Sequence, residues 1–112
     1  MLRWPDRGEV ERALRAWAGA QIDAHPELLR LGYFGSYARG DAGVGSDLDL
    51  VAVIRETDVP FERRGVTWTL ESLPVPAEIL IYTISEWELL LLRGGRFASV
   101  LEKETIWLTE KA

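Results

Sequence analysis

Hydrophobic residues recur at near-helical intervals in the first quarter of the chain. They are Val10, Leu14, Trp17 and Ile22, and this spacing is typical of the buried side of an amphipathic helix. A proline and an aspartate stand just before the segment at positions 5 and 6, and another proline follows it at position 26. Such residues are common at helix ends. The pattern therefore predicts a helix over residues 7–24.

Three later segments are short and predominantly apolar: Leu28–Phe34, Leu48–Ile54 and Ala77–Thr83. Runs of this kind, rich in Val, Ile and Leu, predict buried strands. A short helix is expected at Ser36–Arg39 between the first two strands, followed by a glycine-rich stretch without regular structure. The mixed segment Phe61–Leu73, which ends at a proline, predicts a crossover helix between the second and third strands.

The last third of the chain predicts two more helices and a strand. Ser85 with Glu88 three residues later matches a capping box, and the helix it starts would carry the leucines at 89–92. Because four consecutive residues go around a full helical turn, they cannot all face one core, so we expect a second buried surface there. Glycines at 94 and 95 would end this helix, before a helix over 97–103 and a strand over 105–108.

This order of elements, α-β-α-β-α-β-α-α-β, predicts a small α/β (α+β) domain whose mixed sheet has about four strands. With 112 residues, the chain has the size of one domain, so residues 1–112 are treated as a single unit. A separate substrate-binding domain would not fit beside it.

Composition narrows the classes of function. The chain has no cysteine and a single histidine, His25, so a metal ion would bind carboxylates rather than thiolates or a histidine cluster. No stretch approaches the roughly 20 apolar residues that span a bilayer, and cytoplasmic location is the expectation. The net charge of −5 disfavours long nucleic acid as a partner, whereas a nucleoside triphosphate in complex with magnesium remains suitable.

The segment from Gly35 to Leu50 combines small residues with two acids. Gly35 and Ser36 follow an apolar run at the start of a short helix, where backbone amides can approach phosphate. Asp47 and Asp49 lie two positions apart at the start of a strand, so both side chains point to one side and can reach the same divalent cation. Two simpler interpretations are a solvated aspartate turn and a helix-capping serine.

Known phosphate and calcium motifs do not match this segment. Gly35 and Gly40 have the glycine spacing of a P-loop, but Asp41 and Ala42 occupy the positions that require Lys and Ser or Thr. The ligand spacing and the terminal glutamate of an EF-hand are also missing.

The sequence Gly-Ser-Tyr-Ala-Arg-Gly at 35–40, followed by Ser-Asp-Leu-Asp-Leu at 46–50, resembles the signature of the DNA polymerase beta nucleotidyltransferase superfamily. Its minimal nucleotidyltransferases are similar in size to the whole chain. The resemblance implies the nucleotidyltransferase fold and a magnesium-dependent transfer of a nucleoside monophosphate from a triphosphate. Gly35 and Ser36 would then hold phosphate, Asp47 and Asp49 would bind the metal and serve catalysis, and Ser46 would shape the phosphate loop.

The family also uses a third carboxylate on a neighbouring strand, commonly an aspartate. Glu78 is the candidate here, both as catalytic residue and as metal ligand, because it opens an otherwise apolar run. Its simpler interpretation is an exposed glutamate at a strand end, and Glu71 is a weaker substitute. Arg39 could add a bidentate contact to phosphate.

The resemblance implies one leading function and two alternatives. The leading one is an antitoxin that transfers AMP from ATP to a hydroxyl, most simply a tyrosine, of a helical HEPN-type toxin. The first alternative is an antitoxin that neutralises its toxin by binding alone, motivated by the glutamate at position 78. The second is transfer to a small molecule, as in antibiotic-modifying relatives, although these usually carry an additional domain. Base preference and oligomeric state stay open.

Overall fold

The computed structural model describes residues 3–110 and contains a four-stranded mixed sheet in the order β3-β2-β1-β4. Strand β1 (Leu28–Phe34) pairs antiparallel with β2 (Leu48–Ile54) and with β4 (Ile106–Glu110), whereas β2 and β3 (Ala77–Thr83) are parallel. The predicted fold class is confirmed. The last strand begins one residue later and extends two residues further than the sequence pattern indicated.

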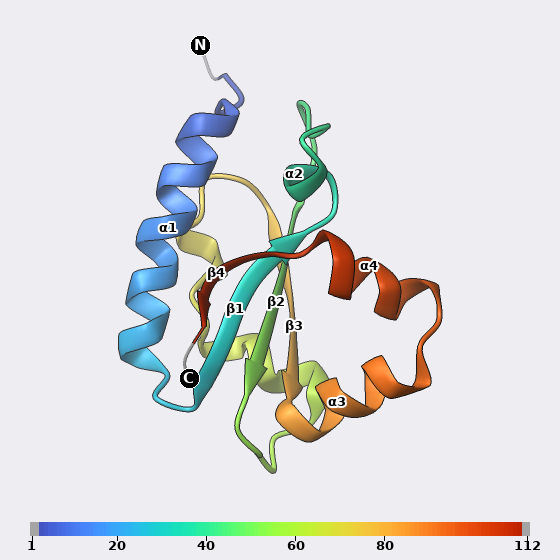
Figure 1. Cartoon of the computed structure of the whole chain (residues 1–112). Helices are drawn as coiled ribbons and strands as arrows, with labels where there is room; N and C mark the ends of the chain where they lie inside the picture. The colour runs from blue at the N-terminus through green and yellow to red at the C-terminus, as the bar shows by residue number, and fades with distance from the viewer. Residues whose placement is uncertain (1–2, 111–112) are drawn as a thin grey trace.

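Helices cover both faces of this sheet. They are α1 (Arg7–Ala24), α2 (Ser36–Arg39), α3 (Ile84–Arg93) and α4 (Arg96–Glu104). Figure 1 shows α1 on one side of the strands and α3 with α4 on the other, while α2 stands at the end of the sheet where β1 finishes.

Side chains of β2 alternate between two hydrophobic cores. Leu48 and Leu50 belong to the core beneath α1, together with Leu14 of that helix. Val51 and Val53 belong to the opposite core, which α3 and α4 cover. This strict alternation follows from the two-residue period of a strand, and it places Asp49 on the α3 and α4 side of the sheet.

Helix α1 begins where the sequence predicts. The Asp6 side chain accepts a hydrogen bond of 2.8 Å from the backbone N–H of Glu9, which satisfies one of the otherwise unpaired donors of the first turn. On the buried side, the indole Nε1 of Trp17 donates to the backbone oxygen of Trp68 at 3.0 Å. This bond ties the helix to the crossover segment, 51 residues away.

The crossover helix predicted over residues 61–73 is wrong. The segment forms two 3-10 helices, η1 (Phe61–Thr67) and η2 (Leu70–Ser72). Trp68 between them is buried and its ring stacks on His25 with a centroid separation of 4.0 Å, while Thr69 has a positive φ of 45°. A continuous α-helix cannot contain such a left-handed residue, so the tertiary packing of Trp68 outweighs the local helical pattern.

The predicted capping box of α3 is shifted by two residues. Thr83, not Ser85, is the N-cap residue: its hydroxyl accepts from the backbone N–H of Glu86 at 3.1 Å, and the Glu86 carboxylate accepts from the backbone N–H of Thr83 at 2.8 Å. Ser85 instead donates from its hydroxyl to Glu56 at 2.6 Å. The helix starts directly at the end of β3 because Thr83-x-x-Glu86 satisfies the same motif.

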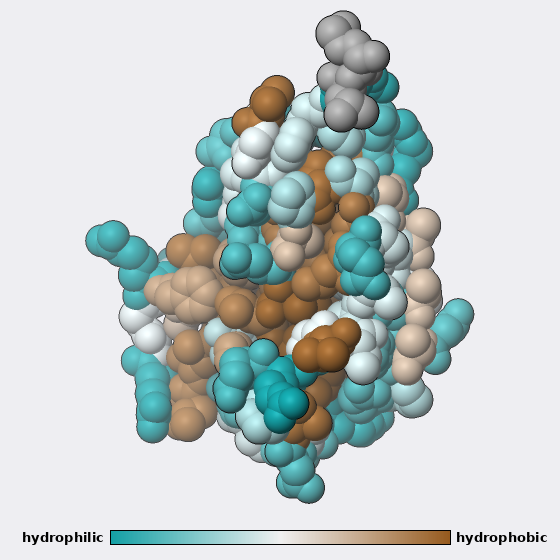
Figure 2. Space-filling view, turned by 180° about the vertical axis from the view of Figure 1, so that it is seen from behind, coloured by the Kyte–Doolittle hydropathy of each residue, from teal (hydrophilic) through white to brown (hydrophobic). Residues whose placement is uncertain are grey.

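The leucine run on α3 divides between core and surface. Leu90 and Leu91 pack against the core beneath α3 and α4, whereas Leu89 and Leu92 stay exposed. Within residues 3–110 nothing covers Leu89 and Leu92, and burial of this side of α3 by another molecule stays a prediction. Figure 2 shows apolar surface on the face turned away in Figure 1, bordered by hydrophilic side chains.

Between residues 3 and 110, no helix has both the length and the apolarity needed to cross a bilayer.

Candidate active site

The glycine at the end of β1 has a backbone that other residues rarely adopt. Gly35 has φ 75° and ψ −153° and serves as the N-cap of α2. A Cβ placed on Gly35 would overlap the Asp49 carboxylate. The position therefore requires glycine for two reasons, a backbone region that is essentially restricted to glycine and the close approach of an acidic side chain. The sequence predicted that Gly35 holds phosphate but did not predict its contact with Asp49.

Ser36 is the first residue of α2, so its hydroxyl does not fill the N-cap position and the interpretation as a helix-capping serine is wrong. The helix is a single turn, closed by hydrogen bonds from the backbone N–H of Arg39 to Gly35 O at 2.9 Å and of Gly40 to Ser36 O at 3.0 Å. Tyr37, which is buried, anchors this turn on the core beneath α1. These contacts hold Gly35 and Ser36 in place at the C-terminal end of β1.

The loop that leads into β2 closes on itself through Ser46. The Ser46 hydroxyl accepts a hydrogen bond of 2.9 Å from the backbone N–H of Gly43, and the Ser46 N–H donates to Gly43 O at 3.0 Å. Gly45 has a φ of 88°, which lets the chain reverse before the strand begins. These bonds fix the direction from which Asp47 and Asp49 enter β2.

Two of the three candidate acids, Asp49 and Glu78, are neighbours in one row of the sheet, and Asp47 directly precedes β2. Asp49 pairs in register with Phe34 of β1 on one side and with Glu78 of β3 on the other. Glu78 is exposed, as is Asp47, whereas Asp49 is half-buried. The sequence prediction that Glu78 stands beside Asp49 on a neighbouring strand is confirmed in register. Glu71 lies in η2, outside this row.

Electrostatics at this row are unfavourable for an isolated carboxylate. Burial raises the pKa of Asp49 above its ordinary value, and the negative charges of Glu78 and Asp47 raise it further, while the Arg39 guanidinium opposes the shift. Crowded carboxylates of this kind gain from a bound cation, which relieves both causes. The direction of the pKa shift is thus the property that distinguishes Asp49 from an ordinary surface aspartate.

Arg39 bridges the motif helix to the end of α4. Its guanidinium contacts Asp41 at 3.3 Å and Glu104 at 3.4 Å, with about half of the side chain exposed. Exposed ion pairs of this geometry contribute little free energy. The side chain can therefore exchange these partners for a phosphate at low cost, and the Arg39 charge already acts on Asp49.

The carboxylate oxygens are suitable ligands for a divalent cation, but the side chains are not arranged around one point. Among residues 3–110, no three Asp, Glu or His side chains are gathered closely enough to form a metal-binding group. Their charges nevertheless act on one another: Glu78 and Asp47 both raise the pKa of Asp49. This is possible because Coulomb interactions reach further than metal–ligand bonds. Asp47, directly before β2, and Asp49, within it, supply hard oxygen donors, the ligand type that magnesium prefers, and Glu78 is the adjacent acid.

One supporting residue was not identified from the sequence. Arg64 of η1 is nearly buried, contacts both oxygens of Glu86 at 2.5 and 3.2 Å, and also donates to the backbone oxygen of Ile81 at 3.0 Å. It therefore connects the crossover to the end of β3 opposite Glu78. The sequence analysis placed the capping box at Ser85 and Glu88 and so gave no role to Glu86, and no pattern pairs Glu86 with an arginine 22 residues earlier.

Solved structures share this fold. A candidate nucleotidyltransferase from Sulfolobus solfataricus is 15% identical, with a TM-score of 0.66 over 93% of this chain and 83% of its own. A toxin–antitoxin structure with AMP-PNP contains a chain that is 18% identical, with a TM-score of 0.56 over 96% of this chain and 75% of its own. At such identities the likeness concerns the fold. No curated protein matches the sequence.

A protein-family model also matches the sequence. The model described as nucleotidyltransferase domain matches residues 22–108, a range that contains β1 to β3, the glycine-serine turn, and Asp47, Asp49 and Glu78. The match extends over most of the chain. This protein belongs to the nucleotidyltransferase domain family.

Proposed function

We propose that this protein transfers AMP from ATP to a hydroxyl of a partner protein and thereby acts as an antitoxin. A single observation carries the proposal: one row of the sheet places Asp49 beside Glu78 and against Gly35, at the start of the motif helix. This brings two acids and the glycine turn of the motif to one point. In the reaction, the acceptor oxygen bonds to the α-phosphorus, the bond from that phosphorus to the bridging oxygen breaks, and pyrophosphate leaves.

Asp47 and Asp49 are the proposed magnesium ligands and catalytic acids of this site. Bound magnesium would neutralise phosphate charge and stabilise the charge that develops on the leaving oxygen. Gly35 and Ser36 are the proposed phosphate contacts, with Ser46 holding the loop. Arg39 would leave its exposed acidic partners to bind phosphate oxygens.

Glu78 is proposed as the third acid, which accepts the proton of the attacking hydroxyl and adds a ligand for the metal. Its exposure and its register beside Asp49 support this role, because an acceptor brought by another protein must reach it from solvent. A glutamate side chain is longer than the aspartate common in the family, and this additional reach is compatible with a general base that approaches from the neighbouring strand.

The partner is proposed to be a helical HEPN-type toxin, modified on tyrosine. Support comes from the signature and from the likeness to a chain in a toxin–antitoxin structure with AMP-PNP. We infer a cytoplasmic reaction because ATP is the proposed donor. The adjacent gene is expected to encode a small helical protein with an Arg-x4-6-His motif.

The direct test is transfer of label. The protein is incubated with that partner, magnesium and ATP labelled at the α-phosphate, and label is expected on the partner. Replacing Asp47 and Asp49 together with Asn should reduce transfer by about 100-fold or more, because metal-assisted charge stabilisation contributes several kcal/mol. Asp58→Asn, at an exposed aspartate beyond the end of β2, is the matched control and should transfer normally. Undiminished labelling by the double variant would exclude the proposed metal ligands.

A binding-only antitoxin is the second candidate. The observation in its favour is that the described acids form no ready group of three for a metal ion. Pyrophosphate release separates the two: transferase activity predicts release that depends on partner, ATP and magnesium. A complex that neutralises the toxin while releasing none would establish sequestration instead.

A further inference from the structure

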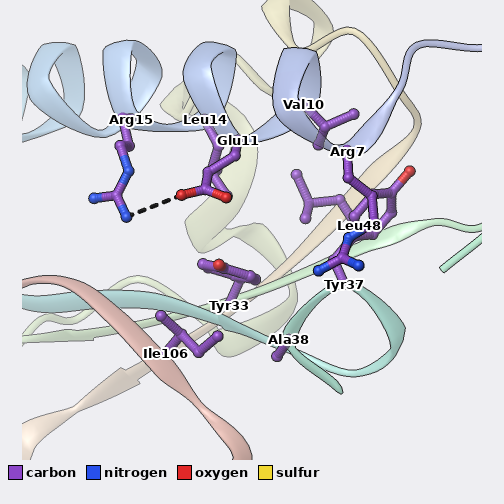
Figure 3. A pocket seen from close by; sticks show the side chains of 10 residues that line it. All are labelled: Arg7, Val10, Glu11, Leu14, Arg15, Tyr33, Tyr37, Ala38, Leu48 and Ile106. Atoms are coloured by element: carbon purple, nitrogen blue, oxygen red, sulfur yellow. Dashed lines mark hydrogen bonds and ion pairs between the residues drawn. The ribbon is translucent and has the colours of Figure 1, made fainter. Parts of the chain in front are cut away.

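A cavity of about 330 Å³ lies beneath α1, between that helix, β1 and the start of β4. Figure 3 shows its lining side chains, which come from α1, the sheet and the motif helix. Val10, Leu14 and Leu48 form its apolar part, and Ile106 lies at the strand edge. The volume is at the lower end of the range for sites that bind small organic molecules.

Several polar side chains line this cavity. Arg7, Arg15, Glu11, Tyr33 and Tyr37 all line it, and the pair between Arg15 and Glu11, at 3.2 Å, is the one bond between two of these side chains. The Arg7 guanidinium donates to the backbone oxygen of Gly40, outside the lining, at 3.4 Å. Both tyrosine residues are largely buried, at 7% and 8% exposure, and their rings contribute apolar surface while their hydroxyls can donate hydrogen bonds. Polar groups of this kind next to an apolar wall are typical of a ligand site.

The charges of the lining favour an anion. The lining contains two arginines and one glutamate. The exposed pair of Arg15 with Glu11 contributes little free energy, so a ligand anion can displace the glutamate. Burial raises the pKa of Tyr33, as does the Glu11 carboxylate. The charges of Arg15 and Arg7 oppose this rise in the pKa of Tyr33. A tyrosine is neutral near pH 7 even at its ordinary pKa, so the Tyr33 hydroxyl can donate a hydrogen bond to an anion.

This cavity is separate from the carboxylate row. Leu48 lines the cavity while Asp49, the next residue, lies on the other side of the sheet. Tyr33 and Phe34 divide in the same way, because successive strand residues point to opposite faces. A molecule beneath α1 therefore leaves the site of Asp49 and Glu78 free, although it touches the motif helix through Tyr37 and Ala38.

We propose that this cavity is a second binding site, for a small organic anion with a flat apolar body, such as an aromatic carboxylate or sulfonate. The anionic group would lie between Arg7 and Arg15, with the Tyr33 hydroxyl as donor, and the ring would pack on Val10, Leu14 and Leu48. This site does not depend on the transferase proposal.

The test uses naphthalenesulfonate as probe and naphthalenemethanol as its neutral analogue, with amide shifts followed by two-dimensional NMR on the whole chain. Saturable shifts are expected along residues 7–15 and 33–38 for the anion, with clearly weaker binding of the alcohol. Arg15→Gln should weaken the anion about 5-fold, as for loss of a partly exposed charged hydrogen bond. Arg12→Gln, an exposed α1 arginine outside the lining, is the control of equal charge.

A gain of affinity guards against variants that simply fold poorly. Glu11→Gln removes the competing carboxylate and should tighten the anion about 3-fold. The proposal is overturned if the alcohol binds as well as the sulfonate, if Arg15→Gln matches Arg12→Gln, or if the shifts fail to saturate or map to residues around Asp49.

Discussion

Replacing Gly35 with alanine tests the geometry on which the candidate site depends. Alanine at φ 75° and ψ −153° enters a backbone region that costs about 1–3 kcal/mol for a residue with a side chain. Its Cβ would also overlap the Asp49 carboxylate, and moving that half-buried side chain adds about 1 kcal/mol, within the range for an off-rotamer side chain. We therefore expect a loss of about 2–4 kcal/mol in the free energy of unfolding.

The assay is urea unfolding followed by tryptophan fluorescence, with thermal unfolding as a second measurement. For a domain of this size the expected loss corresponds to a fall in Tm of about 8–16 °C. The same change should abolish nucleotide transfer, because it displaces Asp49 and blocks the turn proposed to hold phosphate.

Two other glycines separate the causes. Gly45 has a φ of +88° but open space around its Cβ position, so Gly45→Ala incurs only backbone strain, about 1–2 kcal/mol. Gly19 lies in α1 with no atom near its Cβ position, and Gly19→Ala should stabilise by about 0.5–1 kcal/mol. If Gly35→Ala is no more destabilising than Gly45→Ala, the inferred overlap with Asp49 is wrong.

Three further predictions use the same unfolding assay. Asp49→Asn should raise the urea midpoint at pH 7, since a raised native pKa means that the charged form of Asp49 opposes folding. The gain in stability should shrink as the pH falls through the native pKa of Asp49. A gain that does not change with pH would contradict an origin in the Asp49 charge. Glu86→Gln should cost about 1–2 kcal/mol, because it weakens bonds to a nearly buried guanidinium, whereas exposed Glu88→Gln should be almost neutral. Since Arg64 lowers the pKa of Glu86, that contribution is present above the unfolded pKa and disappears as the pH falls through the lower native value. Thr83→Ala should cost about 1 kcal/mol as loss of the cap, and an equal or larger effect of Ser85→Ala would contradict the cap assignment.

The hydrophobic pattern predicted most elements because their burial is periodic. Strand β2 illustrates this: its continuous apolar run indicated burial on both faces, and its side chains do enter two cores. The crossover was mispredicted because Trp68 packs against α1, and a contact so distant in sequence leaves no local trace. The capping box was misplaced because the sequence contains two overlapping matches to the motif, Thr83 with Glu86 and Ser85 with Glu88. The end of β3 at Thr83 decides between them.

For the candidate site, the sequence by itself determined the family, the glycine-serine turn and the identity of the acids, because spacing within one segment controls which side chains share a strand face. Only the tertiary structure decided that Glu78 stands in register with Asp49, that Gly35 contacts the Asp49 carboxylate, and that a polar cavity lies beneath α1. The physical reason is that strand pairing and helix docking join residues far apart in the chain. These contacts follow from the free energy of the whole fold rather than from local pattern.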